Sequence, residues 1–212
     1  MADLVERWLA LHPAADVPTA AAAGEHLLQR YAEPHRRYHD ARHLTEVLDA
    51  VDELAHHARD LRAVRLAAWL HDAVYDTNAP AGANEAASAD LAASVLAPLG
   101  HRDHEVRAVA RLVLLTATHV TAPDDSDGHV LCDADLRILA SSPERYSQYA
   151  ADVRAEYSAV PDAAFASGRT SILTRLLDSD HLFATATARE RWEPRARANI
   201  ADEVARLTAG RR

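Results

Sequence analysis

Apolar side chains recur at helical spacing between residues 44 and 54. They follow one another at intervals of one or three residues, as Leu44, Val47, Leu48, Val51 and Leu54. This spacing places them on one face of an α-helix. The chain has only six glycines among 212 residues, and 49% of it is hydrophobic. We therefore expect an all-α fold, a compact helical bundle with a sizeable core.

Caps and breaks divide the rest of the chain into helices. Asp40 and Asp60 precede apolar periodic segments, where a short acidic side chain accepts hydrogen bonds from free N–H groups. Ser142 followed by Pro143 is typical of a new helix start. We expect helices over residues 1–12, 19–31, 41–54, 61–72 and 84–96. A further helix is expected from a cap at Asp103 to about His119, and another carries Asp135, Ile138 and Leu139 on one face. Two or three more helices are expected beyond Ser142. The expected loops are 34–39, 76–83 and 121–129, with a turn at 167–168 and a break at 193–194, and no linker divides the single domain that we expect over residues 1–212.

Charge and composition exclude several classes of protein. The formal net charge is −9, so a general nucleic-acid-binding surface is not expected. Cys132 is the one cysteine, so no disulfide can form within the chain. The first residues lack a signal-peptide pattern, and no apolar stretch is long enough to span a bilayer. We expect a cytoplasmic protein without a membrane partner.

Two side chains that commonly bind metals stand side by side as His71 and Asp72, at the end of the apolar segment 61–72. Buried there, an imidazole and a carboxylate need partners or a metal. His43 lies on the apolar face described above, and Asp135 lies in another helical segment. Together these four side chains offer two nitrogens and two carboxylates, which suit Mn, Fe, Co or Zn and leave coordination positions open.

Several short segments around this pair resemble the HD-domain superfamily of metal-dependent phosphohydrolases, which is named for the His-Asp pair. The closest resemblance is to a small, poorly characterised bacterial branch of predicted HD-superfamily phosphohydrolases. The segments that carry it are residues 31–39, 43–44, 71–76, 84–89, 117–119, 133–136 and 153–157. The resemblance covers about residues 31–160, the expected HD core. It implies a helical bundle with extra terminal helices, and His43, His71, Asp72 and Asp135 as metal ligands. His39 competes with His43, and Asp133 competes with Asp135.

Other polar residues are candidates for supporting roles. Asp72, Asp76 and Glu85 are expected to orient the attacking water or to move its proton. Arg36 and Arg37 could clamp a phosphate, since guanidinium groups bind its oxygens in pairs. His39 and His119 are expected to bind substrate or to contact a second metal.

The function expected from these features is hydrolysis of a nucleotide or another small phosphorylated metabolite. A divalent metal ion, drawn from Mn, Co, Fe, Ni, Zn and Mg, would activate a water molecule. Two alternatives remain: a di-iron oxygenase of the HD type, which needs a second set of ligands, and a non-catalytic nucleotide-binding module. A homodimer is left open.

Overall fold

Several helices are capped at their N-termini by the side chain of the residue that precedes them. The computed structural model describes residues 2–209, and every regular element in that part of the chain is helical. Asp40 accepts hydrogen bonds from the backbone N–H groups of Arg42 and His43. Asp60 and Ser142 cap their helices in the same way. The expected all-α class and these three caps are confirmed.

Eleven α-helices and three short 3₁₀ helices make up the described chain. In order they are α1 (Ala2–Ala10), α2 (Val17–Tyr31), α3 (Ala41–Glu53), η1 (Ala55–His57), α4 (Leu61–Leu70), α5 (Ala83–Leu96), η2 (Ala97–Leu99), α6 (Asp103–Leu115), α7 (Ser126–Asp135), η3 (Leu136–Ala140), α8 (Pro143–Glu156), α9 (Asp162–Leu177), α10 (Ala186–Arg191) and α11 (Glu193–Ala209).

Some helix ends differ from expectation. α4 ends at Leu70, so His71 and Asp72 lie just beyond it, and α6 ends at Leu115. α7 begins at Ser126, inside the expected loop, and the chain tightens into η3 directly after Asp135. Asp103 is the first residue of α6 and not its cap.

The turn expected at residues 167–168 is wrong. Both residues lie inside α9, which runs without a break from Asp162 to Leu177. Glycine in a helix interior costs roughly 1 kcal/mol relative to alanine, because it gains most freedom on unfolding. Gly168 therefore needs a reason other than a turn. By contrast, a break does occur close to residues 193–194, but it lies at Trp192, between α10 and α11, and residues 193 and 194 begin α11.

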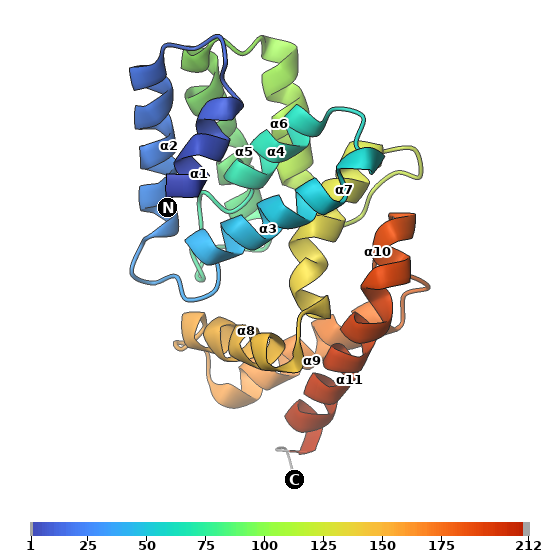
Figure 1. Cartoon of the computed structure of the whole chain (residues 1–212). Coiled ribbons are helices and arrows are strands. Elements are labelled where there is room, and N and C mark those ends of the chain that lie inside the picture. The colour runs from blue at the N-terminus through green and yellow to red at the C-terminus, as the bar shows by residue number, and fades with distance from the viewer. Residues whose placement is uncertain (1, 210–212) are drawn as a thin grey trace.

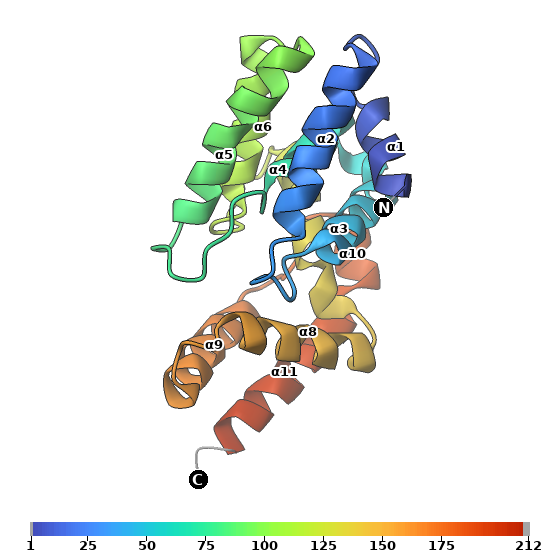
Figure 2. The ribbon, with the colours of Figure 1, turned by 90° about the vertical axis from the view of Figure 1, so that its left-hand side faces the viewer.

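The helices form two groups, one above the other (Figure 1). α1 to α6 make up the upper group, α8, α9 and α11 lie below it, and α7 with η3 leads from one to the other. Figure 2 shows that the connections from α2 to α3 and from α4 to α5 both lie on the side of the upper group that faces α8 and α9. The two expected loops that carry polar residues therefore meet the lower helices.

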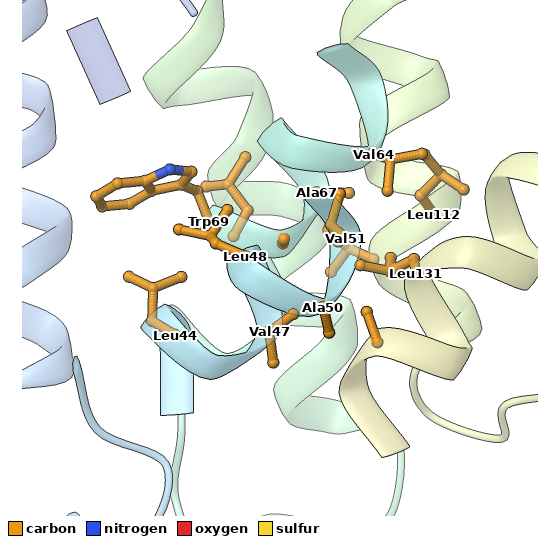
Figure 3. Close-up of a cluster of buried hydrophobic side chains, with 14 of the residues drawn as sticks. Leu44, Val47, Leu48, Ala50, Val51, Val64, Ala67, Trp69, Leu112 and Leu131 are labelled. Atoms are coloured by element: carbon orange, nitrogen blue, oxygen red, sulfur yellow. The ribbon is translucent and has the colours of Figure 1, made fainter. Parts of the chain in front are cut away.

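The core of the upper group lies where α3 and α4 meet α6 and α7 (Figure 3). All five residues of the apolar stripe in the sequence are less than 2% exposed. Opposite them lie Trp69 of α4, Leu112 of α6 and Leu131 of α7. Burial of one such side chain is worth about 1.5–3 kcal/mol. This packing fixes the inward face of α3, on which His43 also lies.

Across residues 2–209, no helix combines the length and the apolar character that crossing a membrane would require.

Candidate metal centre

Four side chains from three parts of the chain converge on one point. Nε2 of His43 lies 3.1 Å from Nε2 of His71, 3.3 Å from Oδ2 of Asp72 and 3.3 Å from Oδ1 of Asp135. Nε2 of His71 lies 3.1 Å from Oδ2 of Asp72 and 3.6 Å from Oδ1 of Asp135. The structure thus brings together all four side chains that the sequence grouped.

Local structure sets the direction of each of these side chains. His43 stands in the first turn of α3, and its ring is buried together with the apolar face of that helix. His71 and Asp72 follow Leu70, the last residue of α4. Asp135 is the last residue of α7. All four side chains therefore lie at or beside helix ends.

A hydrogen bond fixes which nitrogen of His71 carries a proton. Nδ1 lies 2.8 Å from the carbonyl oxygen of Ala68. A carbonyl oxygen can only accept, so Nδ1 must donate. In the neutral ring Nε2 then keeps a free lone pair, and it points at the centre of the cluster. Metal-binding histidines are held in this way, with the far nitrogen bonded to a carbonyl or carboxylate.

The cluster concentrates charge in a nearly closed space. Burial by itself would lower the pKa of His71, but the carboxylates of Asp72 and Asp135, together with Tyr31, outweigh it and raise that pKa well above its ordinary value. Burial likewise opposes ionisation of Asp72 and Asp135, yet the imidazoles around them hold the pKa of both carboxyls well below the usual range. Two carboxylates kept ionised at one point demand positive charge beside them.

The residues present fit a metal ion. Ligand atoms bound at roughly 2.0–2.2 Å to the same ion lie about 3 Å apart, and the contacts above range from 3.1 to 3.6 Å. His43, His71 and Asp72 can each offer one atom to a common ion. The mixture of imidazole and carboxylate is typical of sites for Mn, Fe, Co and Zn.

Asp135, and not Asp133, faces the cluster. Both carboxylate oxygens of Asp133 are occupied elsewhere, each 2.7 Å from a backbone N–H, one of Ala184 and one of Thr185. Asp133 is buried there, and burial raises its pKa. The two aspartates point away from each other because they are two residues apart on α7, which places them on different faces of the helix.

His39 and His119 lie beside the cluster. Nε2 of His119 lies 2.8 Å from Oδ2 of Asp135, which leaves Oδ1 of that carboxylate facing the imidazoles. His119 adopts a left-handed backbone conformation, with φ of 55°, just beyond the end of α6. Such a conformation is uncommon for residues other than glycine. The His39 ring is stacked on Tyr75 at 4.2 Å between centroids.

Glu156 is a residue that sequence reasoning missed. Its Oε1 accepts hydrogen bonds from the backbone N–H groups of residues 37, 38 and 39. Its Oε2 bonds to Nδ1 of His39 at 2.7 Å and accepts from the Tyr75 hydroxyl. Burial opposes ionisation, but the His39 ring and these N–H groups lower the pKa of Glu156 to about 2. Only the tertiary fold reveals this role, because 117 residues separate Glu156 from His39 in the sequence.

The two arginines occupy places other than the expected phosphate clamp. The Arg36 side chain is fully buried, and its guanidinium donates to the carbonyl oxygens of His39, Asp72 and Ala73 and to the Glu33 carboxylate. Its donors are used to hold the backbone around Asp72. Arg37 is exposed and does not line the cavity at the cluster. The structure therefore corrects the expectation for Arg36, and Arg37 gains no support.

A cavity of about 260 Å³ opens beside the cluster. Asp72 and Asp135 border it on one side, and His39, His119, Asp76 and Glu85 line it as well. Asp76 is exposed and accepts hydrogen bonds from the backbone and side chain of Asn78, which lower its pKa. A carboxylate with a lowered pKa is a weaker proton acceptor. The structure thus places Asp76 and Glu85 at the cavity, and the lowered pKa argues against Asp76 as the group that accepts the proton.

Comparison of the chain with protein-family models, with curated proteins and with solved structures gives no match.

Proposed function

We propose that this protein is a metal-dependent phosphohydrolase of the HD type that acts on a small phosphate ester, such as a nucleotide. The observation that carries the proposal is that the carboxylates of the buried cluster of two imidazoles and two carboxylates open on a cavity. Asp72 and Asp135 border the cavity of about 260 Å³, while the rings of His43 and His71 are buried. An open position is what distinguishes a catalytic metal site from a structural one.

His43, His71, Asp72 and Asp135 would hold the ion. A divalent ion at this point supplies a lowered pKa for a water molecule and a Lewis acid for a phosphoryl oxygen. Asp72 borders the cavity, where its carboxylate can orient the attacking water. Glu85 lies on the cavity wall and can accept the proton that the water loses.

Histidines, and not arginines, would balance the charge of the phosphate. The cavity lining contains His39 and His119 but no arginine or lysine from the described chain. Glu156 holds Nδ1 of His39, so the ring presents its Nε2 side away from Glu156. In its imidazolium form, a histidine whose orientation is fixed in this way can donate a hydrogen bond from Nε2 to a phosphate oxygen at low entropic cost.

The proposal is tested by metal loading and hydrolysis. Metal-free protein is loaded with Mn, Co, Zn, Fe(II) or Mg and assayed against p-nitrophenyl phosphate, nucleotides and sugar phosphates. We expect one ion per chain and hydrolysis with at least one of these metals. Asp72→Asn should lower both metal affinity and hydrolysis by roughly 100-fold or more. Asp124→Asn, a change on an exposed loop, is the matched control and should alter neither.

Other outcomes would favour the alternatives. Metal-loaded protein that binds nucleotides but hydrolyses nothing would indicate a non-catalytic binding module. Two irons per chain and consumption of oxygen would indicate a di-iron oxygenase. That chemistry needs a second set of ligands. Nε2 of His119 is bonded to Asp135 and Nδ1 of His39 is bonded to Glu156, so each ring has only its other nitrogen to offer.

A further inference from the structure

A second cavity adjoins the first and has the opposite character. Its volume is about 420 Å³, and its walls come from α8, α9 and the two residues Tyr38 and His39. His39 and Tyr157 line both cavities, so the two spaces share a boundary. The first cavity holds carboxylates and imidazoles, whereas the second is lined mainly by aromatic and aliphatic side chains.

Aromatic rings frame this second cavity. The rings of Tyr38 and Tyr149 lie 4.6 Å apart edge to face, and those of Tyr157 and Phe165 lie 6.2 Å apart. Rings in such tilted arrangements offer faces and edges to a further ring between or beside them. Ile172 also lines the cavity and is 47% exposed, so its side chain adds accessible apolar surface to this wall.

Small residues on α9 create the space. Ala164 and Gly168 are one helical turn apart and both line the cavity. A Cβ atom placed on Gly168 would have no atom within 4 Å. Gly168 has a helical φ, so neither a tight turn nor a close contact requires glycine here. The absence of a side chain at this position keeps the cavity open.

The charge in this cavity is already paired. Arg169 is the one arginine in its lining, and Glu203 binds its guanidinium at 2.9 Å. The lining contains no other formally charged residue besides His39. A phosphate group placed in this cavity would find no unpaired cation in the wall to bind it. An uncharged ring needs no such partner.

We infer that the second cavity is the subsite for an uncharged aromatic group of the substrate, and that the phosphate of the same molecule reaches the metal centre past His39 and Tyr157. The substrate class is therefore a phosphate monoester of an aromatic compound, with a nucleobase or an aryl ring in the second cavity. This inference rests on the proposed function for the place of the phosphate, but binding alone can test it. Pockets of 300–1,000 Å³ lined by aromatic side chains are typical of small-molecule sites.

Calorimetry with non-hydrolysable probes measures this subsite without hydrolysis. Metal-loaded protein is titrated with phenylphosphonate and with methylphosphonate, which share the metal-binding group and differ by the ring. We expect phenylphosphonate to bind at least about tenfold more tightly, because the ring leaves water for an apolar wall. The phosphonate analogues of AMP and of ribose 5-phosphate, in which a methylene group replaces the ester oxygen, give the same comparison for a nucleobase and separate the two kinds of ring.

The decisive variant is Gly168→Leu, which fills the cavity and raises helix propensity. It should abolish most of the preference for phenylphosphonate and leave the affinity for methylphosphonate and the metal content unchanged. Ser167→Leu adds the same side chain to the neighbouring exposed position and should keep the preference. Thermal denaturation verifies that both variants fold.

The outcomes separate this inference from the proposed function. Hydrolysis of p-nitrophenyl phosphate with equal affinities for the two phosphonates would overturn the subsite and leave the hydrolase in place. A preference for phenylphosphonate that Gly168→Leu removes, without hydrolysis of any ester, would support the subsite and overturn the hydrolase. A preference that survives Gly168→Leu would overturn the subsite.

Discussion

Nε2 of His119 lies 2.8 Å from Oδ2 of Asp135, while Oδ1 of the same carboxylate faces His43 at 3.3 Å. One carboxylate thus joins a side chain at the cavity to the centre of the buried cluster. Groups that hold a metal ligand in place typically contribute 10- to 100-fold in metal affinity.

His119→Ala is therefore expected to weaken metal binding by about 10- to 100-fold without changing the number of ions bound per chain. The reason is that Asp135 would lose the partner that aligns its Oδ1. Competition titration with a chelator measures the affinity, and elemental analysis measures the stoichiometry. A fall from two ions to one would show instead that His119 is a ligand of a second metal.

Asp133 and Asp135 should separate stability from metal binding. Asp133→Ala leaves two backbone N–H groups, those of Ala184 and Thr185, without their acceptor. We expect it to lower the free energy of unfolding by about 2–4 kcal/mol and to leave the metal content unchanged. Asp135→Asn should lower the metal content and leave the free energy of unfolding of the metal-free protein nearly unchanged. Urea denaturation of metal-free protein and elemental analysis are the two measurements, and loss of metal in Asp133→Ala would contradict the assignment.

Arg36→Lys is expected to destabilise the protein although the charge is kept. Three carbonyl oxygens and a carboxylate surround the guanidinium, and a single ammonium group cannot reach them all. A loss of about 2–3 kcal/mol in the free energy of unfolding should result. Arg37→Lys, at the neighbouring exposed position, is the control and should change it by less than about 0.5 kcal/mol. Equal effects in the two variants would rule out this role for Arg36.

Stability should fall in mild acid because of a buried histidine pair. Nδ1 of His12 lies 3.0 Å from Nε2 of His101, and Arg62 is nearby. Burial, with the charges of His101 and Arg62, lowers the pKa of His12 to about 4. The folded protein therefore keeps His12 neutral, whereas the unfolded chain takes up a proton near pH 6.5. The free energy of unfolding should decrease as the pH falls from about 6.5 to about 4, by up to about 3 kcal/mol.

Unfolding in urea at a series of pH values checks this expectation, with metal-free protein so that metal release does not interfere. His12→Asn should flatten the decrease. His104→Gln, at an exposed position, should leave it unchanged. If the free energy of unfolding of His12→Asn fell with pH by the same amount, the pH dependence would have to come from groups other than His12.

The sequence could predict features that depend on neighbouring residues. The caps at Asp40 and Asp60 follow from side-chain chemistry within three residues, and the inward face of α3 follows from its apolar period. Because His43 lies on that face, its burial could also be predicted. The grouping of His71 and Asp72 with His43 and Asp135 relied on residue type, and the geometry agrees with it.

Features that depend on distant contacts could not be predicted. Arg36 lies in a polar loop, where a guanidinium is commonly solvated, and only the approach of residues 72 and 73 shows that it is buried. Glu156 bonds to a segment more than a hundred residues away. The turn expected at Gly168 is wrong because glycine commonly marks turns, whereas here it lies inside α9 with open space beside it.

Apart from His39 and Tyr157, the two cavities are lined by different stretches of the chain. Residues between 43 and 135 supply the four side chains of the candidate metal centre, whereas α8, α9 and the loop between them supply most of the aromatic wall. If the second cavity holds the aromatic group as inferred above, substitutions on one face of α9 would change which ring is accepted without moving any side chain of the candidate metal centre. Related chains could then differ in the substrate that they accept while they keep the same centre, and positions 164, 168 and 172 are where a designer would alter the choice of ring.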